Sequence, residues 1–275
     1  MIAAVLVTHN SERWLKATLD SIANQTRKPD PIIVIDDNST DATEKILSEY
    51  NITPIKATTT ATETLTRIAQ NFQQGIREAR GADIVVLGDH DDIWHSTRVE
   101  RQAEILMSNP QALMVASDGT LVGDTNTPIG GTLRTTFPVA ANWNELPAEQ
   151  QLKYALKHSL ATGGASALKP DYFAAQEIPA GWLHDRWWSL LATVRLGMLI
   201  ETESVIDYRV QGDQQVGLDT GTQAMGAGAK AKARAANLGA GMQKAKDLST
   251  ILRAQCATPA LWKQLSRTHI LRASL

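Results

Sequence analysis

The chain has 275 residues, of which 43% are hydrophobic and 20% are charged, a composition typical of one large globular domain or of one domain with an appendage. Its formal net charge of −2 provides no overall attraction for nucleic acid, so no nucleic-acid partner is predicted. Cys256 is the only cysteine, which excludes an intramolecular disulfide and a zinc site built from cysteines.

The sequence predicts no membrane-spanning segment. The apolar run at residues 1–8 has no basic residues before it and meets polar residues at His9, so it is too short for a signal peptide. No later segment approaches the roughly 20 apolar residues that cross a bilayer. Together with the single cysteine, this favours a cytoplasmic location, and attachment to the inner face of the membrane stays open.

The first hundred residues alternate between apolar runs and helical patterns. Runs rich in β-branched residues predict buried parallel strands at residues 2–8, 31–36, 84–88 and, with a weaker pattern, 52–56. Apolar residues recur at helical spacing over residues 14–22, around Ile46 and Leu47, and over residues 65–80. This alternation predicts βαβ units, a parallel sheet and a Rossmann-like α/β fold.

The rest of the chain has a less regular pattern. A strand is predicted at residues 112–117, and residues 118–146 contain no convincing element, which is typical of a functional loop or a lid. Helices at 148–158 and 183–196 and strands at 165–168, 199–201 and 205–208 follow. Residues 217–241, rich in Gly, Ala and Lys, predict a flexible linker or a weak helix, and residues 247–271 an amphipathic helix. We therefore divide the chain into a domain of residues 1–215 and a linker with a C-terminal helical extension, residues 216–275.

Acidic residues stand directly after two of the predicted strands. Asp36 and Asp37 end one strand, and Asp89, Asp91 and Asp92 follow another. Ligands bind at this carboxyl edge of open parallel sheets, because loops and helix N-termini converge there. Three carboxylates within four residues repel one another unless a cation neutralises them, and Asp-x-Asp suits a hard divalent ion. We therefore favour a metal and phosphate site over a solvated acidic turn in which Asp92 caps the next helix.

The turn at residues 36–41 has a structural use as well. Asp, Asn and Ser at these places are typical of Asx turns and helix caps. We expect Asp41 to cap the following helix, and Asp36 or Asp37 to face the ligand cleft.

Two further segments carry candidate functional residues. Residues 184–188, with the sequence HDRWW, begin a predicted helix with an aspartate that is either a cap or a proton acceptor. The tryptophans favour the second use, because flat apolar walls bind sugar faces and desolvation keeps a carboxylate basic, although they would equally fit the core. Arg209, at the end of the last predicted strand, is either a surface residue or a bidentate ligand for a diphosphate.

Taken together, these motifs resemble the family 2 glycosyltransferases of the GT-A fold. The resemblance covers roughly residues 1–215, and five motifs in order make a chance agreement improbable. They are VLVTHN at 5–10, IDDNSTD at 35–41, LGDHDDIW at 87–94, HDRWW at 184–188 and YRVQG at 208–212. The DHDDIW form is especially similar to the branch that builds bacterial surface polysaccharides, rhamnosyltransferases included. The fold class expected is α/β, a GT-A, mostly parallel sheet flanked by helices with a helical C-terminal tail.

The resemblance implies a role for each matching residue. Nucleotide-sugar binding is implied for Thr8, Asn10, Asp36, Asp37, Asp89, His90 and Arg209. Asp185 matches the catalytic base of the inverting members, and the acceptor and sugar are expected to be lined by Gly163, Gly164, His184, Trp187 and Trp188. The metal, Mg²⁺ or Mn²⁺, is expected at Asp91, Asp89 and Gln211. Gln211 departs from the family pattern, because many relatives carry a histidine there, and a neutral amide is a weaker ligand.

The sequence thus predicts a metal-dependent, inverting glycosyltransferase. The implied donor is a nucleoside diphosphate sugar of the UDP or dTDP type, and the implied acceptor is a glycan or a lipid-linked sugar in cell-surface glycan synthesis. Peripheral membrane contact through the C-terminal helix is a further prediction, since Arg253, Lys263, Arg267 and Arg272 stand beside Trp262 there. Packing of that helix back onto the domain is the alternative.

Other functions fit the residues less well. A nucleotidyltransferase is expected to carry a Gly-rich basic loop after the first strand, and an aspartyl phosphatase to carry Asp-x-Asp on it, whereas this strand ends in Thr8 and His9. The alternative from a different class is a catalytically silent GT-A module that serves as a glycan-assembly or binding component. Gln211 and the Gly/Ala/Lys-rich segment are the features that keep this alternative open.

Overall fold

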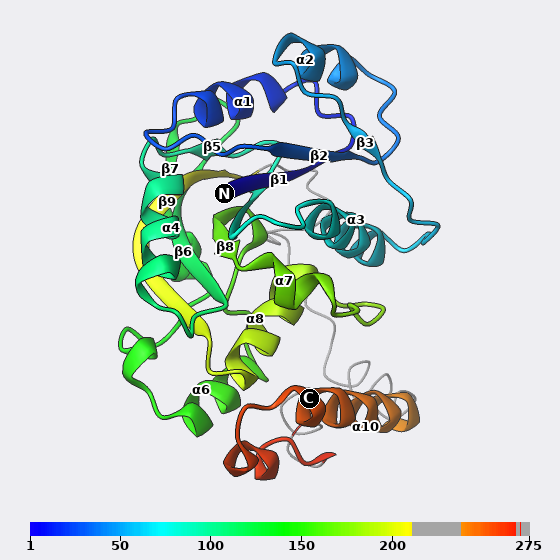
Figure 1. Ribbon diagram of the computed structural model, residues 1–275, viewed down its shortest axis with the longest axis vertical. Helices are drawn as coiled ribbons and strands as arrows, with labels where there is room; N and C mark the ends of the chain where they lie inside the picture. Colours follow the sequence, from blue (N-terminus) through cyan, green and yellow to red (C-terminus); the bar gives the residue numbers. More distant parts are fainter. Residues whose placement is uncertain (211–237, 268–269, 271–275) are drawn as a thin grey trace.

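Figure 1 shows the computed structural model of the chain, which describes residues 1–210, 238–267 and 270. The helices and strands follow in the order β1 (Ile2–Thr8), α1 (Leu15–Ala23), β2 (Ile32–Asp36), α2 (Thr43–Glu49), β3 (Ile55–Lys56), α3 (Thr64–Glu78), β4 (Ile84–Asp89), β5 (Ile93–Trp94), α4 (Arg98–Ser108), β6 (Met114–Val122), β7 (Pro128–Thr132), α5 (Leu133–Thr136), η1 (Trp143–Glu145), α6 (Ala148–Ala155), η2 (Gly163–Ala165), β8 (Ser166–Leu168), α7 (Pro170–Ala174), α8 (His184–Val194), β9 (Met198–Arg209), α10 (Leu238–Gln255) and η3 (Pro259–Lys263).

Within the described residues, nine strands form one sheet in the order β3-β2-β1-β4-β8-β6-β9-β5, with β7 paired to β6. The strands β3, β2, β1 and β4 are parallel neighbours, and Leu6 of β1 lies opposite Val34 and Gly88. β8 is antiparallel to β4 and β6, while β6 and β9 are parallel. Because parallel strands end at the same edge, the carboxyl ends of β1, β2 and β4 open on one side of the sheet.

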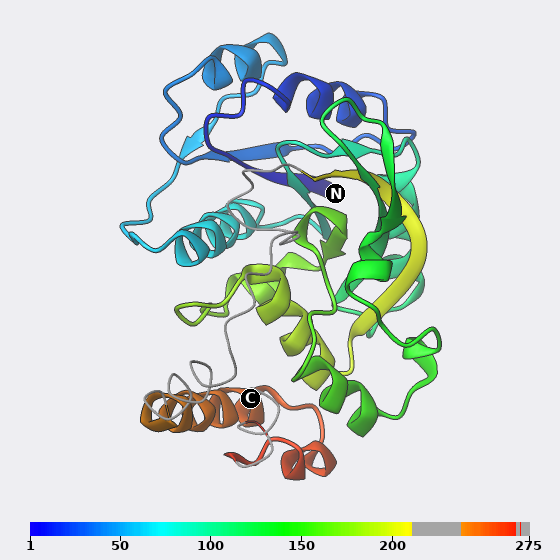
Figure 2. The same cartoon turned by 180° about the vertical axis from the view of Figure 1, so that it is seen from behind.

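Helices cover both faces of the sheet, as Figures 1 and 2 show. Alternate residues of β1 face opposite sides, as the period of two of a strand requires. Ala3 and Val5 belong to an apolar cluster with α3, α7 and α8, and Ala4 and Leu6 to a second cluster with α1, α2 and α4. Both faces of the parallel strands are therefore buried, and the predicted α/β fold class with a central, mostly parallel sheet is confirmed.

The prediction that residues 118–146 lack a regular element is wrong. β6 continues to Val122, β7 pairs with it, and α5 and η1 follow. β6 stays paired with β9 through Asp118 and Gly119, with register shifts at both. Asp118 is buried and accepts hydrogen bonds from the amides of Gly119 and Arg134 (2.8 and 3.0 Å). Asp118 and Gly119 interrupt the apolar pattern of a buried strand. The sequence pattern therefore predicts an end of the strand at residue 117, whereas β6 ends at Val122.

The two short strands predicted at residues 199–201 and 205–208 are one strand, β9. Its middle residues, Thr202 and Glu203, are exposed where the strand passes the edge of the molecule. Because these polar residues interrupt the apolar pattern, the sequence predicts two short strands where the structure has one.

The C-terminal segment packs on the domain. The helix predicted over residues 247–271 is two elements, because α10 ends at Gln255 and η3 begins at Pro259, whose ring and missing N–H interrupt a helix. Leu252 and Leu265 are fully buried in the cluster that contains α8, and the amide of Ala257 donates to the carbonyl of Val194 (2.9 Å). The linker predicted at residues 217–241 lies outside the described residues, apart from the first turn of α10.

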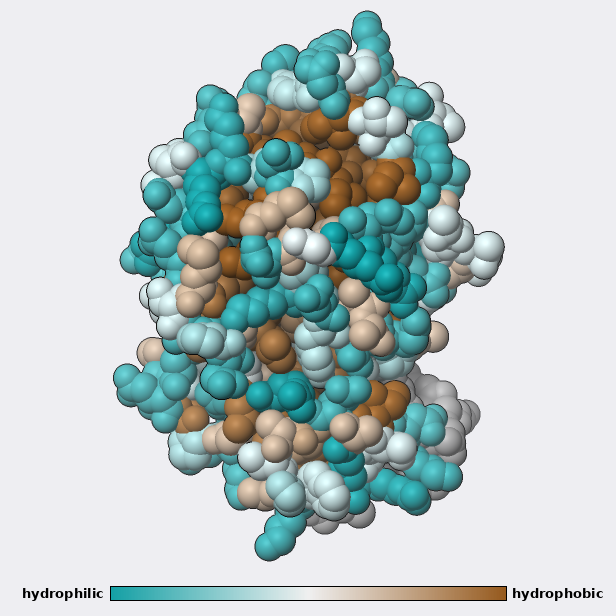
Figure 3. All heavy atoms as spheres, in the orientation of Figure 1, coloured by the Kyte–Doolittle hydropathy of each residue, from teal (hydrophilic) through white to brown (hydrophobic). Residues whose placement is uncertain are grey.

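Among the residues described, none forms a helix that is both long and apolar enough to span a bilayer. Hydrophilic side chains cover most of the face shown in Figure 3, and apolar atoms show between them, chiefly in its upper half.

Candidate active site

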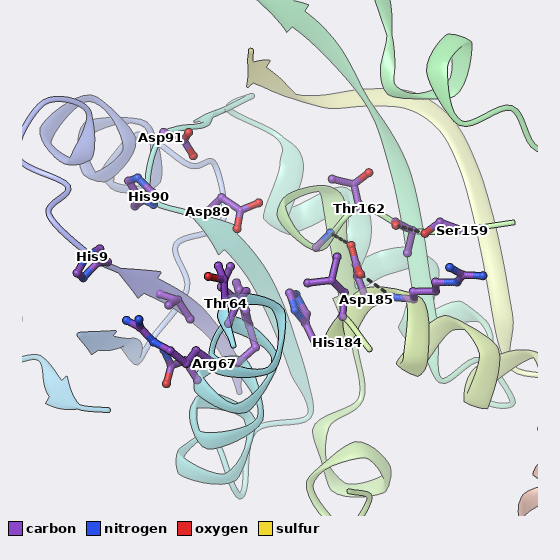
Figure 4. Close-up of a pocket in the computed structure, with 18 of the residues that line it drawn as sticks. His9, Thr64, Arg67, Asp89, His90, Asp91, Ser159, Thr162, His184 and Asp185 are labelled. Atoms are coloured by element: carbon purple, nitrogen blue, oxygen red, sulfur yellow. Dashed lines mark hydrogen bonds between the residues drawn. The ribbon is translucent and has the colours of Figure 1, made fainter. Parts of the chain in front are cut away.

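A cavity of about 510 Å³ opens where the carboxyl ends of β1, β2 and β4 meet α3 and α8. Figure 4 shows its two ends. At the α3 end lie His9, Thr64 and Arg67, and at the α8 end lie Ser159, Thr162 and Asp185. Seven residues predicted from the sequence line this one cavity: Asp37, Asp89, His90, Asp91, Gly163, His184 and Asp185.

Asp37 is held at the α3 end by two residues of α3. Its Oδ2 accepts hydrogen bonds from Nη2 of Arg67 (2.7 Å) and Nδ2 of Asn71 (2.9 Å), and all three residues line the cavity. Arg67 and Asn71 were not predicted as site residues. Their spacing of four places them on one face of a helix, which is the signal that could have found them. Only the tertiary structure shows that this face of α3 lies at the ligand-binding edge of the sheet.

Three residues predicted to bind the nucleotide, Thr8, Asn10 and Asp36, do not line the cavity. Asp36 is 1% exposed and accepts hydrogen bonds from Thr8 Oγ1 (3.0 Å), Ser39 Oγ (2.6 Å) and Lys56 Nζ (3.1 Å). Burial acts to raise the pKa of Asp36, but these hydrogen bonds hold it below its ordinary value. The three residues therefore brace the turn that presents Asp37, and their own contact with a nucleotide stays a prediction.

Asn10 and Asp41 complete this turn. Asn10 has a positive φ of 47° and accepts a hydrogen bond at Oδ1 from the amide of Thr40 (2.9 Å). Asp41 accepts at Oδ1 from the amide of Thr43 (3.0 Å), at the start of α2. The N-cap residue of α2 is Ala42, so Asp41 is not the cap residue that was predicted but binds the first amide of the helix from one position earlier.

The acidic loop after β4 is tightly packed. Asp91 and Asp92 are 7% and 1% exposed, and Asp89 is half-buried. A side chain at Gly164 would place its Cβ 2.5 Å from Asp92 Oδ2 and 2.6 Å from Asp89 Oδ2, so only glycine fits there. Gly164 thus does not line the cavity as predicted but lets the backbone approach the carboxylates.

Burial and mutual repulsion perturb these carboxyl groups. Burial, followed by the charges of Asp91 and Asp185, raises the pKa of Asp89 to about 7. Burial, followed by the charges of Asp91 and Asp89, raises the pKa of Asp92 well above its ordinary value. Asp92 Oδ2 is buried with no hydrogen-bond partner in the part of the chain that the structure describes. A cluster of this kind is stabilised by an added positive charge.

A buried arginine beneath the loop supplies part of that charge. Arg98 is 0% exposed, donates from Nη2 to the carbonyl of Leu87 (2.5 Å) and lies over the ring of Trp94 at 3.9 Å. Burial lowers its pKa to about 9, against the charges of Asp92 and Asp89, which raise it. The sequence pattern does not indicate this residue, because arginine is rarely buried in a protein core.

The residues present fit a divalent cation only in part. Within the described ranges, no three His, Cys, Asp or Glu side chains are grouped so that they could hold a metal. Asp89 and Asp91 both line the cavity and supply carboxylate oxygens, which hard cations prefer. Mg²⁺ is commonly held by one or two carboxylates and completes its shell with waters and phosphate oxygens. The pair therefore fits an ion that binds together with a diphosphate.

Asp185 lies at the first turn of α8, at the other end of the cavity. Its Oδ2 accepts from the amide of Gly163 (3.0 Å) and its Oδ1 from the amide of Arg186 (2.6 Å). Burial raises the pKa of Asp185 to about 6, although these backbone hydrogen bonds act to lower it. The side chain is therefore ionised at neutral pH and more basic than an exposed aspartate.

His184 forms the wall between the two ends of the cavity. It is 4% exposed, and its ring stacks on Phe72 of α3 with a centroid distance of 3.8 Å. Neither ring nitrogen has a hydrogen-bond partner among the residues that the structure describes. Burial lowers the pKa of His184 to about 3, so the imidazole is neutral.

This burial predicts a pH-dependent difference in stability. Below pH 6.5 the unfolded chain takes up a proton at His184, whereas the native imidazole stays neutral until about pH 3, so acid favours unfolding. The free energy of unfolding of His184→Gln minus that of wild type should increase by about 2 kcal/mol when the pH is lowered from 7.5 to 5. Urea denaturation at both pH values measures this. The exposed His158→Gln is the control, and a difference that does not change with pH would contradict the assignment.

Trp187 and Trp188 do not line the cavity, which corrects the prediction that they bind sugar. They are 1% and 0% exposed and belong to the apolar cluster between α8 and the sheet. The helical repeat of α8 explains this, because residues three and four positions after His184 return to its inward face. Their use in the core, the alternative weighed from the sequence, is the observed one.

Arg209 does not line the cavity, and its predicted contact with a diphosphate stays a prediction. It is 1% exposed, and its guanidinium donates to the carbonyls of Asp91 (3.0 Å), Gly123 (3.1 Å) and Asp124 (2.9 Å). The same group lies 4.0 Å from the ring centre of Trp14. Arg209 thereby ties the β6–β7 turn to the acidic loop.

Gln211, the third predicted metal ligand, lies outside the described residues.

Comparisons with known proteins show the family of the chain. The family model described as "Glycosyl transferase family 2" matches residues 3–173, more than half of the chain. Escherichia coli UDP-Glc:α-D-GlcNAc-diphosphoundecaprenol β-1,3-glucosyltransferase WfgD is 27% identical over 114 residues, which are 42% of this chain and 44% of that protein. Shigella flexneri dTDP-rhamnosyl transferase RfbG is 27% identical over 108 residues, 38% of this chain and 37% of its own. The chain thus matches less than half of the length of these curated relatives.

Two solved structures show the same fold. S. aureus TarS 1-349 in complex with UDP-GlcNAc has a TM-score of 0.54 at 16% identity, over 78% of this chain and 59% of that one. Glucosyl-3-phosphoglycerate synthase from Mycobacterium tuberculosis, in complex with Mn²⁺ and UDP-glucose, has a TM-score of 0.51 at 18% identity, over 78% and 72% of the two chains. At these identities the likeness concerns the fold.

Proposed function

The chain belongs to glycosyl transferase family 2, and we propose that it transfers a sugar, with inversion, from a UDP- or dTDP-type donor to a hydroxyl of a glycan or lipid-linked acceptor. The names of two relatives give a GlcNAc-diphosphoundecaprenol glucosyltransferase and a dTDP-rhamnosyl transferase, and we propose that this chain acts in cell-surface polysaccharide synthesis. One observation carries the proposal. A single cavity joins the carboxylates at the end of β4 to Asp185 at the start of α8.

The proposed division of labour follows the two ends of the cavity. At the α3 end, Asp37 is fixed by Arg67 and Asn71 and offers an oriented carboxylate to the nucleoside base. At the α8 end, Asp185 accepts the proton of the acceptor hydroxyl as this attacks the anomeric carbon of the donor. A direct displacement of this kind inverts the configuration at that carbon. The Asp37 and Asp185 carboxylates thus act on opposite ends of the donor–acceptor pair.

We propose Mg²⁺ or Mn²⁺ as the cofactor, held by Asp91 and Asp89. The support is the donor set described above and the Mn²⁺ complex of the structurally similar glucosyl-3-phosphoglycerate synthase. A bound cation would neutralise the negative charge that develops on the departing diphosphate. The chain itself contributes Arg98 and Arg209, which fix the backbone of this loop by donating to the carbonyls of Leu87 and Asp91.

A donor screen tests the proposed function. UDP-glucose, UDP-galactose, UDP-GlcNAc and dTDP-rhamnose are each added with Mn²⁺, and the melting temperature and the release of nucleoside diphosphate are measured. We expect one donor to raise the melting temperature, since a bound ligand stabilises the native state, and to be hydrolysed slowly without acceptor. EDTA should remove both effects. Binding without any hydrolysis or transfer would instead favour a catalytically silent module, and no binding would refute the proposal.

The membrane contact and the cytoplasmic location stay predictions. The exposed side of α10 and η3 carries Trp262, 48% exposed, with Arg253, Lys263 and Arg267 on the surface around it. We propose that this side meets anionic lipid headgroups, to which basic and aromatic side chains are suited. The protein should co-sediment with vesicles that contain phosphatidylglycerol but not with phosphatidylcholine alone. Equal sedimentation of wild type and a Trp262→Ala, Lys263→Ala variant would contradict this.

A further inference from the structure

Arg186 is a charged residue of the cavity wall that the proposed mechanism does not use. It follows Asp185 directly, is exposed, and lines the α8 end of the cavity with Ser159 and Thr162. Within the described part of the chain, its guanidinium is in no hydrogen bond and no ion pair. The other arginine of the wall, Arg67, is bound to Asp37. Arg186 therefore presents a positive charge to whatever occupies the α8 end.

The guanidinium of Arg186 rests on an aromatic support. It lies 5.2 Å from the ring centre of Trp182, which in turn makes an edge contact with the buried Trp187 at 5.4 Å. The loop that carries Trp182 is tied to α3, because the amide of Gly181 donates to Thr66 Oγ1 (3.2 Å). An arginine stacked on a ring keeps its N–H donors, which lie in the guanidinium plane, available at the edge. The ring thus favours this position of the guanidinium before a ligand arrives.

This charge has a cost for the proposed chemistry. The positive charge of Arg186 acts to lower the pKa of Asp185, against the burial that raises it. A proton acceptor works better when it is more basic, so a cation at this place weakens the base. A neutral sugar acceptor would accept only ordinary hydrogen bonds from the guanidinium. An acceptor with a negative group beside its reacting hydroxyl would accept charge-assisted hydrogen bonds, which are roughly twice as strong and offset the weakening of the base.

We propose that the acceptor carries an anionic oxygen group, a phosphoryl or carboxylate group near the attacked hydroxyl, and that Arg186 binds it. The inference rests on the proposed function and names its acceptor class. In the reaction, the acceptor oxygen forms a bond to the anomeric carbon and the bond from that carbon to the diphosphate oxygen breaks. The hydroxyl proton passes to Asp185, and the nucleoside diphosphate leaves with the electron pair. The anionic group stays unchanged and serves to orient the acceptor.

The test uses matched acceptors and the donor chosen by the screen. Three forms of acceptor are compared: alkyl diphosphate-linked GlcNAc, an alkyl glucuronide and an uncharged alkyl GlcNAc glycoside. Wild type should release nucleoside diphosphate faster with one of the two anionic forms than with the uncharged one, and which of the two does so identifies the source of the charge. Arg186→Gln should raise the KM for that acceptor about 10- to 100-fold, the scale of a lost charge-assisted hydrogen bond, with a smaller change in kcat. Arg186→Lys should recover part of the loss.

Arg195 provides the control. It lies at the other end of α8, is exposed and is also close to an aromatic ring, that of Tyr172 at 5.9 Å, but it does not line the cavity. Arg195→Gln should leave the KM for the acceptor unchanged. Calorimetry with UDP and Mn²⁺ should give the same affinity for wild type and Arg186→Gln, because Arg186 is assigned to the acceptor.

Three results would overturn the inference: an unchanged KM in Arg186→Gln, equal use of charged and uncharged acceptors by wild type, or donor hydrolysis that neither anionic acceptor accelerates. A wild type that binds no donor at all would refute the proposed function instead, so the two failures are distinguishable.

Discussion

Asp185→Asn is expected to lower the rate of sugar transfer by about 100-fold or more, the scale of a lost general base, while the affinity for nucleoside diphosphate changes little. An amide has nearly the shape of the carboxylate but cannot take up the acceptor proton. The residue lies at the α8 end of the cavity, away from the residues around Asp37, so nucleotide contacts should survive. Nucleoside diphosphate release with donor and acceptor measures the rate, and calorimetry with UDP and Mn²⁺ measures the affinity.

Two further variants make this experiment decisive. Asp185 accepts hydrogen bonds from the amides of Gly163 and Arg186, one at each carboxylate oxygen. An asparagine can accept only at its single oxygen, so the free energy of unfolding of Asp185→Asn must be measured as well. Asp185→Glu keeps a carboxylate and should retain more activity than Asp185→Asn. Asp171→Asn changes an exposed aspartate in the first turn of α7 and should leave the rate unchanged. Full turnover in Asp185→Asn would remove the residue from its role.

The same residue sets a pH dependence. Burial raises the pKa of Asp185 to about 6, and only the ionised carboxylate can accept a proton. The rate should therefore be constant near pH 8 and fall as the pH drops through 6, to about one tenth of its plateau at pH 5. A pH–rate profile of kcat/KM measures this. The acid limb should be missing from the residual activity of Asp185→Asn, and an identical limb in that variant would assign it to another group.

Asp91→Ala is expected to abolish the part of nucleotide binding that depends on the metal. Asp91 is 7% exposed and lines the cavity beside Asp89, and no group of three or more His, Cys, Asp or Glu side chains in the described residues could hold a metal. The affinity for UDP with Mn²⁺ should fall about 100-fold, the upper end of what loss of a supporting group costs a metal site. It should then equal that of wild type with EDTA. Calorimetry with and without EDTA measures both values.

The control for this variant is Asp20→Ala, an exposed aspartate of α1 that is paired with Lys16 and lies outside the cavity. It should bind UDP and Mn²⁺ as wild type does. If EDTA has no effect on wild type, the enzyme binds its donor without a metal. If Asp91→Ala keeps binding that EDTA removes, the metal is held by other residues.

The positions of the candidate site residues could be predicted where the signal is local. The apolar runs that form β1, β2 and β4 have the composition of strands buried on both faces, and parallel strands must end at one edge. Asp37, Asp89 and Asp91 stand at those ends, so their meeting in one cavity follows from the order of the elements. Asp185 was placed there by its resemblance to a family motif, which carries tertiary information that its own neighbourhood does not.

The orientation of side chains was less predictable. Arg209 and the two tryptophans of α8 stand within the right motifs, yet they face the interior, and the polar residues of β6 hid a buried strand. In each case the residue type allows two environments. Packing against elements far away in the chain selects one of them.

By itself, the sequence determined the α/β alternation, the edge of the sheet that carries the acidic residues and the family. The tertiary structure alone decided that Arg67 fixes Asp37 across 30 residues, that Arg98 lies beneath the acidic loop, and that Arg186 lines the cavity next to Trp182. The physical reason is that strand and helix formation depend on patterns over a few neighbouring residues. The partner of a charged side chain depends on which distant segments the folded core brings to it.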